Sequence, residues 1–300
     1  MRGRLVWLCL GALACAPSED DGPAASLETC DGASGFSMVV NELTFGRQEP
    51  VGVTPGFDLD GRVSEPDDIL GCNKPDLVSP EGVPGIDSAF SGLVPVLEQT
   101  EAAAVEGLVQ DSIRSGELLL VIDVWGVDDA DNDDCVSVEV VRAEGTPMLG
   151  TDGNLLDGQT FARHPTIRSG TTTTASIKDG RIVASGLSMG LELQVLDEYL
   201  AFDMTDGQFS AVRVPEAEGL DDTGMNYAGE HWVGVFSGGV STQQIVDEFA
   251  LDDIDIADLI ATAVPAAADL YNTETNECDR ISITFEYQGI PAYIAGDGAR

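Results

Sequence analysis

Two short segments of the chain are crowded with aspartate, whose short carboxylate suits it to binding a hard cation. The first contains Asp58, Asp60 and Gly61, followed by Asp67. The second, residues 126–134, has the sequence GVDDADNDD. Its candidate ligands are Asp128, Asp129, Asp131 and Asp133. Because sites built only of oxygen ligands select calcium over zinc or copper, both segments predict calcium binding.

The first aspartate segment resembles a piece of an EF-hand or a related calcium loop, in which alternate carboxylates point inward and a glycine permits the sharp turn. With Gly61 at the glycine position, the first ligand position falls on Gly56, which has no side-chain oxygen. The twelfth falls on Asp67, where the motif has glutamate. The chain therefore departs from the EF-hand proper. The alternative for both segments is an exposed loop whose charges are screened by dissolved salt.

A nucleophile motif supplies one catalytic alternative. Residues 186–190 match G-x-S-x-G and so resemble the nucleophile elbow of α/β-hydrolases, with Ser188 as the nucleophile and His231 downstream as its base. The elbow requires a strand, a turn and a helix, whereas residues 191–195 alternate as a strand does. With 34 glycines in 300 residues the match also arises easily by chance. A secreted serine hydrolase is therefore the alternative, and a glycine-punctuated hairpin the main interpretation.

The aromatic residues Trp125, Tyr227 and Trp232 lie near the ends of expected strands, where they can line a site for a sugar or a peptide. They are also well suited to a buried core. An extracellular protein or a polysaccharide is accordingly the expected kind of ligand. The chain contains neither a P-loop nor a G-x-G-x-x-G sequence, so no nucleotide cofactor is expected.

The N-terminus has the layout of a secretory signal. Arg2 and Arg4 precede the apolar residues 5–14, a stretch too short to span a membrane, and Cys15 follows directly. We expect cleavage of residues 1–14, lipidation of Cys15 and a disordered acidic tether over residues 15–29. The sequence Ala-Leu-Ala before the cysteine also fits ordinary cleavage, which would release a soluble secreted protein.

The number of cysteines supports lipidation at Cys15. Without the signal peptide and Cys15, four cysteines remain, an even number that suits two disulfides in an oxidising compartment. Four cysteines allow three pairings. Because the termini of a domain commonly lie close together, we favour Cys30 with Cys278, which leaves Cys72 with Cys135.

The charge of the chain excludes two classes of partner. There are 53 acidic residues against 14 lysines and arginines, a formal net charge of −39. Nucleic acids and anionic lipid surfaces would be repelled, so the lipid anchor is the only membrane contact that we expect. With 43% hydrophobic residues, residues 30–300 can nevertheless bury the core of a single β-rich domain held by disulfides.

Alternating hydrophobicity indicates that strands dominate the fold. The expected strands cover residues 36–45, 117–125, 136–140, 191–195, 199–204, 209–214 and 281–287. An Asp-Gly turn is expected at Asp206. Helical spacing is limited to residues 87–115 and 242–263. The prediction is a mainly β (α+β) fold, an antiparallel β-sandwich or a partly closed barrel with a few helices.

The signal, the tether and the aspartate-rich, lysine-poor domain together resemble uncharacterised acidic lipoproteins of Gram-negative bacteria. That resemblance, with Ala16 after the lipidated cysteine, implies the outer membrane of the cell envelope and carries no catalytic residues with it. We therefore expect a non-catalytic binding or adhesion module stabilised by calcium. The alternatives are the serine hydrolase and a purely structural surface protein.

Overall fold

The computed structural model describes residue 30 and residues 32–100, 105–167, 169–195, 198–215, 229–251 and 257–295. The expected signal peptide, Cys15, the tether and Tyr227 lie outside these ranges. No helix among the described residues is long and apolar enough to cross a membrane.

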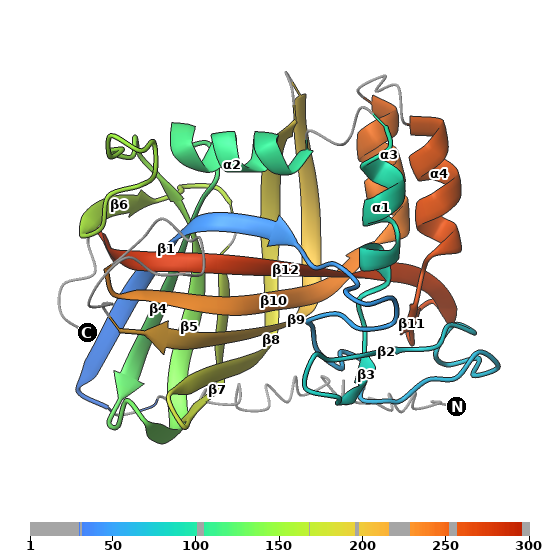
Figure 1. Cartoon of the computed structure of the whole chain (residues 1–300), viewed down its shortest axis with the longest axis horizontal. Helices are drawn as coiled ribbons and strands as arrows, with labels where there is room; N and C mark the ends of the chain where they lie inside the picture. The colour runs from blue at the N-terminus through green and yellow to red at the C-terminus, as the bar shows by residue number, and fades with distance from the viewer. Residues whose placement is uncertain are drawn as a thin grey trace, which may run out of the picture.

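Eight antiparallel strands close into a barrel (Figure 1). In order around the ring they are β1 (Ser34–Phe45), β4 (Leu119–Val127), β5 (Asn132–Glu144), β7 (Gly170–Lys178), β8 (Arg181–Val195), β9 (Glu198–Val214), β10 (His231–Ser241) and β12 (Glu277–Ile294). β12 closes the ring by pairing with β1, from Met38 opposite Pro291 to Phe45 opposite Phe285. The predicted mainly β fold with few helices is confirmed, and the sheet forms a barrel rather than a sandwich.

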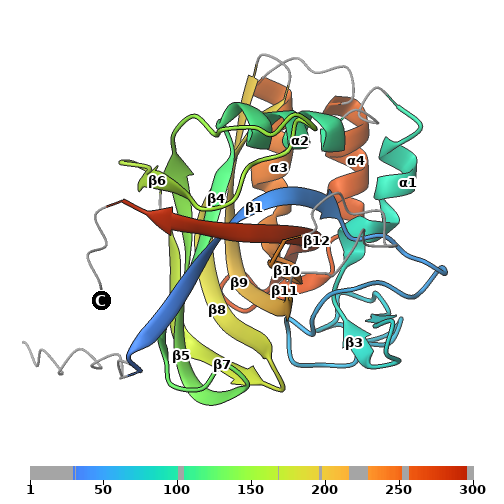
Figure 2. The same ribbon diagram turned by 60° about the vertical axis from the view of Figure 1, so that its left-hand side comes forward.

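The remaining elements lie in the segments that connect consecutive barrel strands. Between β1 and β4 lie β2 (Leu77–Val78), β3 (Pro84–Ile86), the 3-10 helix η1 (Ala89–Gly92), α1 (Val94–Leu97) and α2 (Val105–Ser115). β6 (Gln159–Arg163) follows β5, while α3 (Thr242–Leu251), α4 (Ala257–Ala266) and β11 (Leu270–Asn272) precede β12. Helix α2 crosses one end of the barrel, and α1, α3 and α4 stand side by side next to it (Figures 1 and 2). The helices therefore gather at one end of the molecule.

Side chains fill the middle of the barrel. The rings of Phe209 and Tyr287 stack with centroids 5.7 Å apart, and the Tyr287 hydroxyl donates a hydrogen bond to the Ser210 carbonyl at 3.0 Å. Trp232 is buried and stacks on Phe36 at 5.2 Å, so it belongs to the core rather than to a surface sugar site. Because small eight-stranded barrels are just wide enough to be filled by side chains, this part of the interior is packed.

The predicted turn at Asp206 is wrong, because Asp206 and Gly207 form a bulge inside β9. Asp206 has a φ of 54°, and the pairing with β10 shifts between Ser237 and Gly239. Two residues of β9 thus lie opposite the single residue Gly238, which is the pattern of a β-bulge. β9 therefore continues without interruption from the packed middle of the barrel to the end covered by the helices.

The favoured disulfide pairing is also wrong. The structure joins Cys30 to Cys135 and Cys72 to Cys278, so all four cysteines form disulfides but with other partners. Because β1 and β12 are antiparallel, the residues that precede one strand lie beside the end of the other. Cys30 therefore lies far from Cys278 and close to the β4–β5 hairpin that carries Cys135.

Replacing Phe209 by alanine is expected to lower the free energy of unfolding by about 3–5 kcal/mol, since the ring is fully buried and its loss leaves a cavity. Urea unfolding of the oxidised protein measures this change. The control is Tyr293→Ala, a residue 60% exposed, for which we expect a change within about 0.5 kcal/mol. Similar losses in both variants would contradict a packed barrel centre.

Candidate functional site

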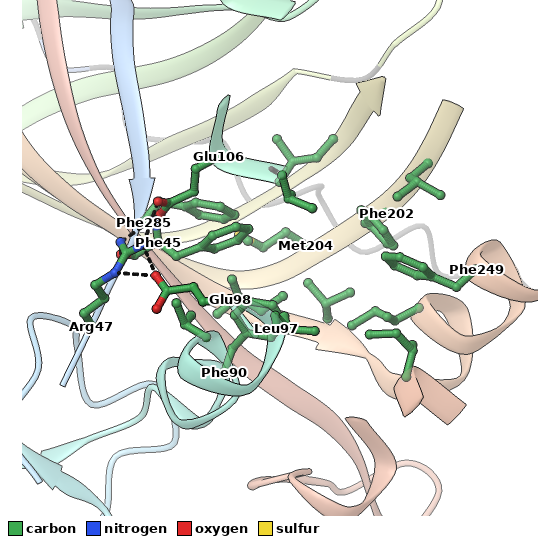
Figure 3. A pocket seen from close by; sticks show the side chains of 18 residues that line it. Phe45, Arg47, Phe90, Leu97, Glu98, Glu106, Phe202, Met204, Phe249 and Phe285 are labelled. Atoms are coloured by element: carbon green, nitrogen blue, oxygen red, sulfur yellow. Dashed lines mark hydrogen bonds and ion pairs between the residues drawn. The ribbon is translucent and has the colours of Figure 1, made fainter. Parts of the chain in front are cut away.

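A mostly apolar cavity of about 110 Å³ lies at the helix-covered end of the barrel (Figure 3). Apart from three charged residues its lining is apolar, and it includes five of the ten phenylalanines of the chain. These are Phe45, Phe90, Phe202, Phe249 and Phe285. Cavities in the mouths of β-barrels are common sites for small ligands.

The barrel supplies one wall of the cavity by continuing its inward-facing rows of side chains. Ile283 and Phe285 alternate along β12 with the same period of two that points Tyr287 into the packed middle. Phe45 lies opposite Phe285 in the pairing of β1 with β12. Beyond the bulge, Met204 and its neighbours on β9 extend this wall.

The helices supply the other wall. Leu97 of α1, Ile245 and Phe249 of α3, and Ile260 of α4 line the cavity. Figure 3 shows Leu97 and Phe249 on the helical side. Helices α3 and α4 pack against each other. The cavity thus depends on residues that lie far apart in the sequence and meet only when the barrel is closed.

The charged end of the cavity is an arginine held between two glutamates. Nη2 of Arg47 donates to Oε1 of Glu98 at 2.7 Å and to Oε2 of Glu106 at 2.6 Å. Nη1 donates to Oε1 of Glu106 at 2.9 Å, so the Arg47–Glu106 pair is bidentate. The same Oε1 accepts the backbone N–H of Phe45 at 2.7 Å. These contacts tie the end of β1 to α1 and α2 (Figure 3).

This end of the cavity reaches solvent. The side chains of Arg47, Glu98 and Glu106 are 33%, 47% and 28% exposed. The hydrogen bonds that Arg47 donates to Glu106 and, to a smaller extent, to Glu98 raise the pKa of Arg47 above its ordinary value, although burial opposes the shift. Arg47 stays cationic, and the three side chains together carry a net negative charge. The cavity therefore has an apolar interior and an acidic opening.

A second group of polar side chains lies next to β3. Carboxylate oxygens of Asp58, Asp60 and Asp87 lie within 4.8 Å of one another. Asp87 Oδ2 accepts the N–H of Leu59 at 2.6 Å, and Asp58 Oδ1 accepts that of Gly61 at 2.6 Å. Oxygens bound to one calcium ion at 2.3–2.6 Å lie within about 5 Å of each other, so this donor set fits calcium.

The environment of Asp87 disfavours its charged form. Burial, and then the negative charge of Asp269, raises the pKa of Asp87 to about 8. Burial also raises the pKa of Asp60, and it raises the pKa of Asp76 to about 6. Carboxylates that are close together and partly buried favour uptake of a proton or binding of a cation.

The structure brings together only part of the predicted metal ligands. Asp58 and Asp60 lie close together, as expected. Asp67 is exposed and lies outside their group, and the third carboxylate of the group is that of Asp87 instead. In sequence Asp87 follows Asp60 by 27 residues without any motif, so only the fold identifies it.

The loop with Asp128, Asp129, Asp131 and Asp133 does not converge on a common point among the described residues. The carboxylates of Asp129 and Asp133 accept hydrogen bonds from the loop's own backbone instead. Asp133 Oδ2 accepts the N–H of Asp128 at 2.7 Å, and Asp129 Oδ1 accepts that of Asp131 at 2.8 Å. Such bonds are typical of aspartate in turns, and they explain why the pKa of Asp133 is lowered. The described geometry therefore does not support a shared calcium site in this loop, and calcium binding there stays a prediction.

The predicted hydrolase pair is separated. Ser188 lies in the middle of β8 next to Met189, which pairs with Met204, whereas His231 pairs with Val214. Ten residues of β9 separate these positions, or about 30 Å at about 3.3 Å per residue. The motif lies within a strand rather than at a turn between a strand and a helix, so these residues do not form a catalytic pair.

Pattern analysis missed the cavity because its lining residues resemble ordinary core positions. The sequence analysis did not single out Arg47 either, although it lies two residues after a predicted strand in a chain with few cations.

In comparisons of the chain with models of protein families, with curated proteins and with solved structures, nothing matches.

With a chelator present, the free energy of unfolding is expected to fall as the pH rises from about 4 to about 8. The folded state holds a proton on Asp87 up to a pKa of about 8, and the unfolded chain loses it near 4. In Asp87→Asn the free energy of unfolding should no longer fall above pH 6. Urea unfolding at each pH measures this free energy. The exposed control Asp67→Asn should still show the fall above pH 6. If the free energy of unfolding of Asp87→Asn falls with pH as steeply as that of the unmodified protein, Asp87 does not carry the raised pKa.

Proposed function

We propose that the protein is a lipid-anchored, non-catalytic binding module of the Gram-negative cell envelope, and that the cavity at the end of the barrel holds its ligand. The cavity carries this proposal. It combines a preformed apolar space with a small number of charged groups at one end, which is the usual composition of a small-ligand site. The proposed ligand is therefore a small apolar molecule, and no longer the protein or polysaccharide that we expected from the sequence.

The lipoprotein part of the proposal is supported by the signal layout and by the cysteines. Both pairs among Cys30, Cys72, Cys135 and Cys278 are bonded, which leaves Cys15 as the odd cysteine after signal cleavage. Disulfides form and persist in oxidising compartments such as the periplasm. Lipid attachment at Cys15 and an outer-membrane location complete the proposed arrangement.

Calcium is the second component of the proposal. Asp58, Asp60 and Asp87 would hold the ion through their carboxylates, and its charge would replace the proton that Asp87 otherwise retains. Because these residues precede or flank β3, calcium would stabilise the segment that leads to η1 and α1. Its role in this proposal is structural.

The cavity is expected to bind naphthalene, an uncharged ten-carbon molecule, because the space is apolar and preformed. Titration with naphthalene fluorescence or calorimetry measures the affinity of the oxidised protein. Leu200→Trp places a larger side chain in the cavity and should abolish binding. The exposed control Val51→Ala, at a residue outside the lining, should leave it unchanged. Equal binding by all three proteins would show that the cavity is not the site.

Calcium at about a hundred times its dissociation constant is expected to raise the thermal midpoint by about 5 °C, because an ion that binds only the folded state stabilises it. Magnesium at the same ionic strength should have a smaller effect, since it demands a tighter octahedral site. Asp58→Asn should remove the calcium shift, whereas Asp128→Asn should retain it. An identical midpoint with calcium and with chelator would disprove calcium binding.

A further inference from the structure

From the acidic opening of the cavity we infer that its ligand is a small apolar molecule whose polar end is a primary amine. The inference rests on the proposed function, because it names the class of ligand for the same cavity. It depends on two observations, the volume of the apolar space and the charges at its solvent end.

The volume limits the ligand to roughly ten methylene-sized groups. A cavity of about 110 Å³ offers roughly ten water positions, at about 10–15 Å³ each, and one methylene takes about the space of one water. The walls carry both aromatic rings and aliphatic side chains, so they can pack against a chain or a ring. A lipid with two long acyl chains is too large for this space.

The charges at the opening disfavour an anionic head group. Arg47 is the single cation of the lining, and its guanidinium already donates to both glutamates. A carboxylate ligand would bring a third negative charge to one arginine, or would have to displace Glu98 or Glu106. Like charges brought together at a partly desolvated site oppose binding.

The same charges favour an ammonium group. Both hydrogen bonds that Glu98 accepts from Arg47 end on Oε1, and among the described residues Oε2 accepts none. Glu98 is the most exposed of the three side chains, so an amine beside it would keep part of its hydration. With its amine beside Oε2 of Glu98, the ligand can extend its alkyl or aryl part along the apolar walls of the cavity.

Acidic residues behind the opening add to this preference. Burial raises the pKa of Glu286, Arg47 acts against this shift, and the charges of Glu49 and Glu106 add to it. Glu286 is thus close enough to Arg47, Glu49 and Glu106 for its charge to interact with theirs. The negative charge of Glu286 makes the opening more favourable for a cation.

Three ligands with the same ten-carbon chain test the inference: decylamine, 1-decanol and decanoate. Calorimetric titration uses the full-length protein with both disulfides formed, at pH 7 and matched ionic strength, below the concentrations at which micelles form. We expect decylamine to bind about threefold more tightly than decanol, as an exposed ion pair provides. Decanoate should bind at least about tenfold more weakly than decylamine.

Variants separate head-group recognition from general attraction to the acidic surface. Glu98→Gln should bring the decylamine affinity close to the decanol affinity of the same variant, whereas the exposed Glu81→Gln should alter the affinity for neither ligand. Leu200→Trp and the milder Phe249→Trp should both weaken all three ligands. Circular dichroism and the thermal midpoint report whether these variants fold.

The outcomes distinguish failure of the amine inference from failure of the proposed ligand-binding function. Decanoate binding as tightly as decylamine, or decylamine binding that survives both cavity variants in folded protein, would overturn the amine inference. If decanol and decanoate bind and decylamine does not, the cavity binds ligands but of another class. If neither naphthalene nor any of the three ten-carbon ligands binds, the proposed function itself fails.

Discussion

The pairing of the first barrel strand with the last is the constraint on which the rest of the molecule depends. β1 and β12 lie more than 200 residues apart in the sequence, yet their ladder closes the ring and leaves the barrel without an unpaired edge. Phe45 and Phe285, which line the cavity, are partners in this ladder. Arg47 lies two residues beyond the end of β1, so the charged opening is positioned by the same closure.

The scarcity of cations determines how the acidic residues are arranged. Several arginines of the described chain bond carboxylates, as Arg47 does with two glutamates and Arg163 with Glu139. With 53 acidic residues and 14 lysines and arginines, the chain cannot pair each acid with its own cation, so the others must remain in water, accept backbone N–H groups or become protonated. Asp133 illustrates the second solution and Asp87 the third, with opposite effects on their pKa values.

Sequence patterns predicted six of the eight barrel strands because each alternates apolar and polar residues over its own length. They left a sandwich and a partly closed barrel as alternatives, because the pairing of β1 with β12 that closes the barrel leaves no local signal. The bulge at Asp206 looked like a turn because Asp-Gly suits both, and only the neighbouring strand distinguishes them. The disulfide pairing failed for a related reason, since proximity of the termini does not say which ends of antiparallel strands meet. Two of the three members of the acidic group, Asp58 and Asp60, were predicted from the sequence, but Asp87 joins them only through the fold.

Ring closure by the C-terminal strand also sets an order of events during synthesis. The Cys30–Cys135 disulfide joins residues that are both present once less than half of the chain has been made. The Cys72–Cys278 disulfide and the β1–β12 ladder must wait for nearly the whole chain. Non-local pairings of this kind make folding slow, because a long loop must close before its contacts can form. Until β12 arrives, β1 and β10 each lack a neighbour and the apolar interior stands open, so the unfinished chain is the stage most exposed to aggregation and proteolysis.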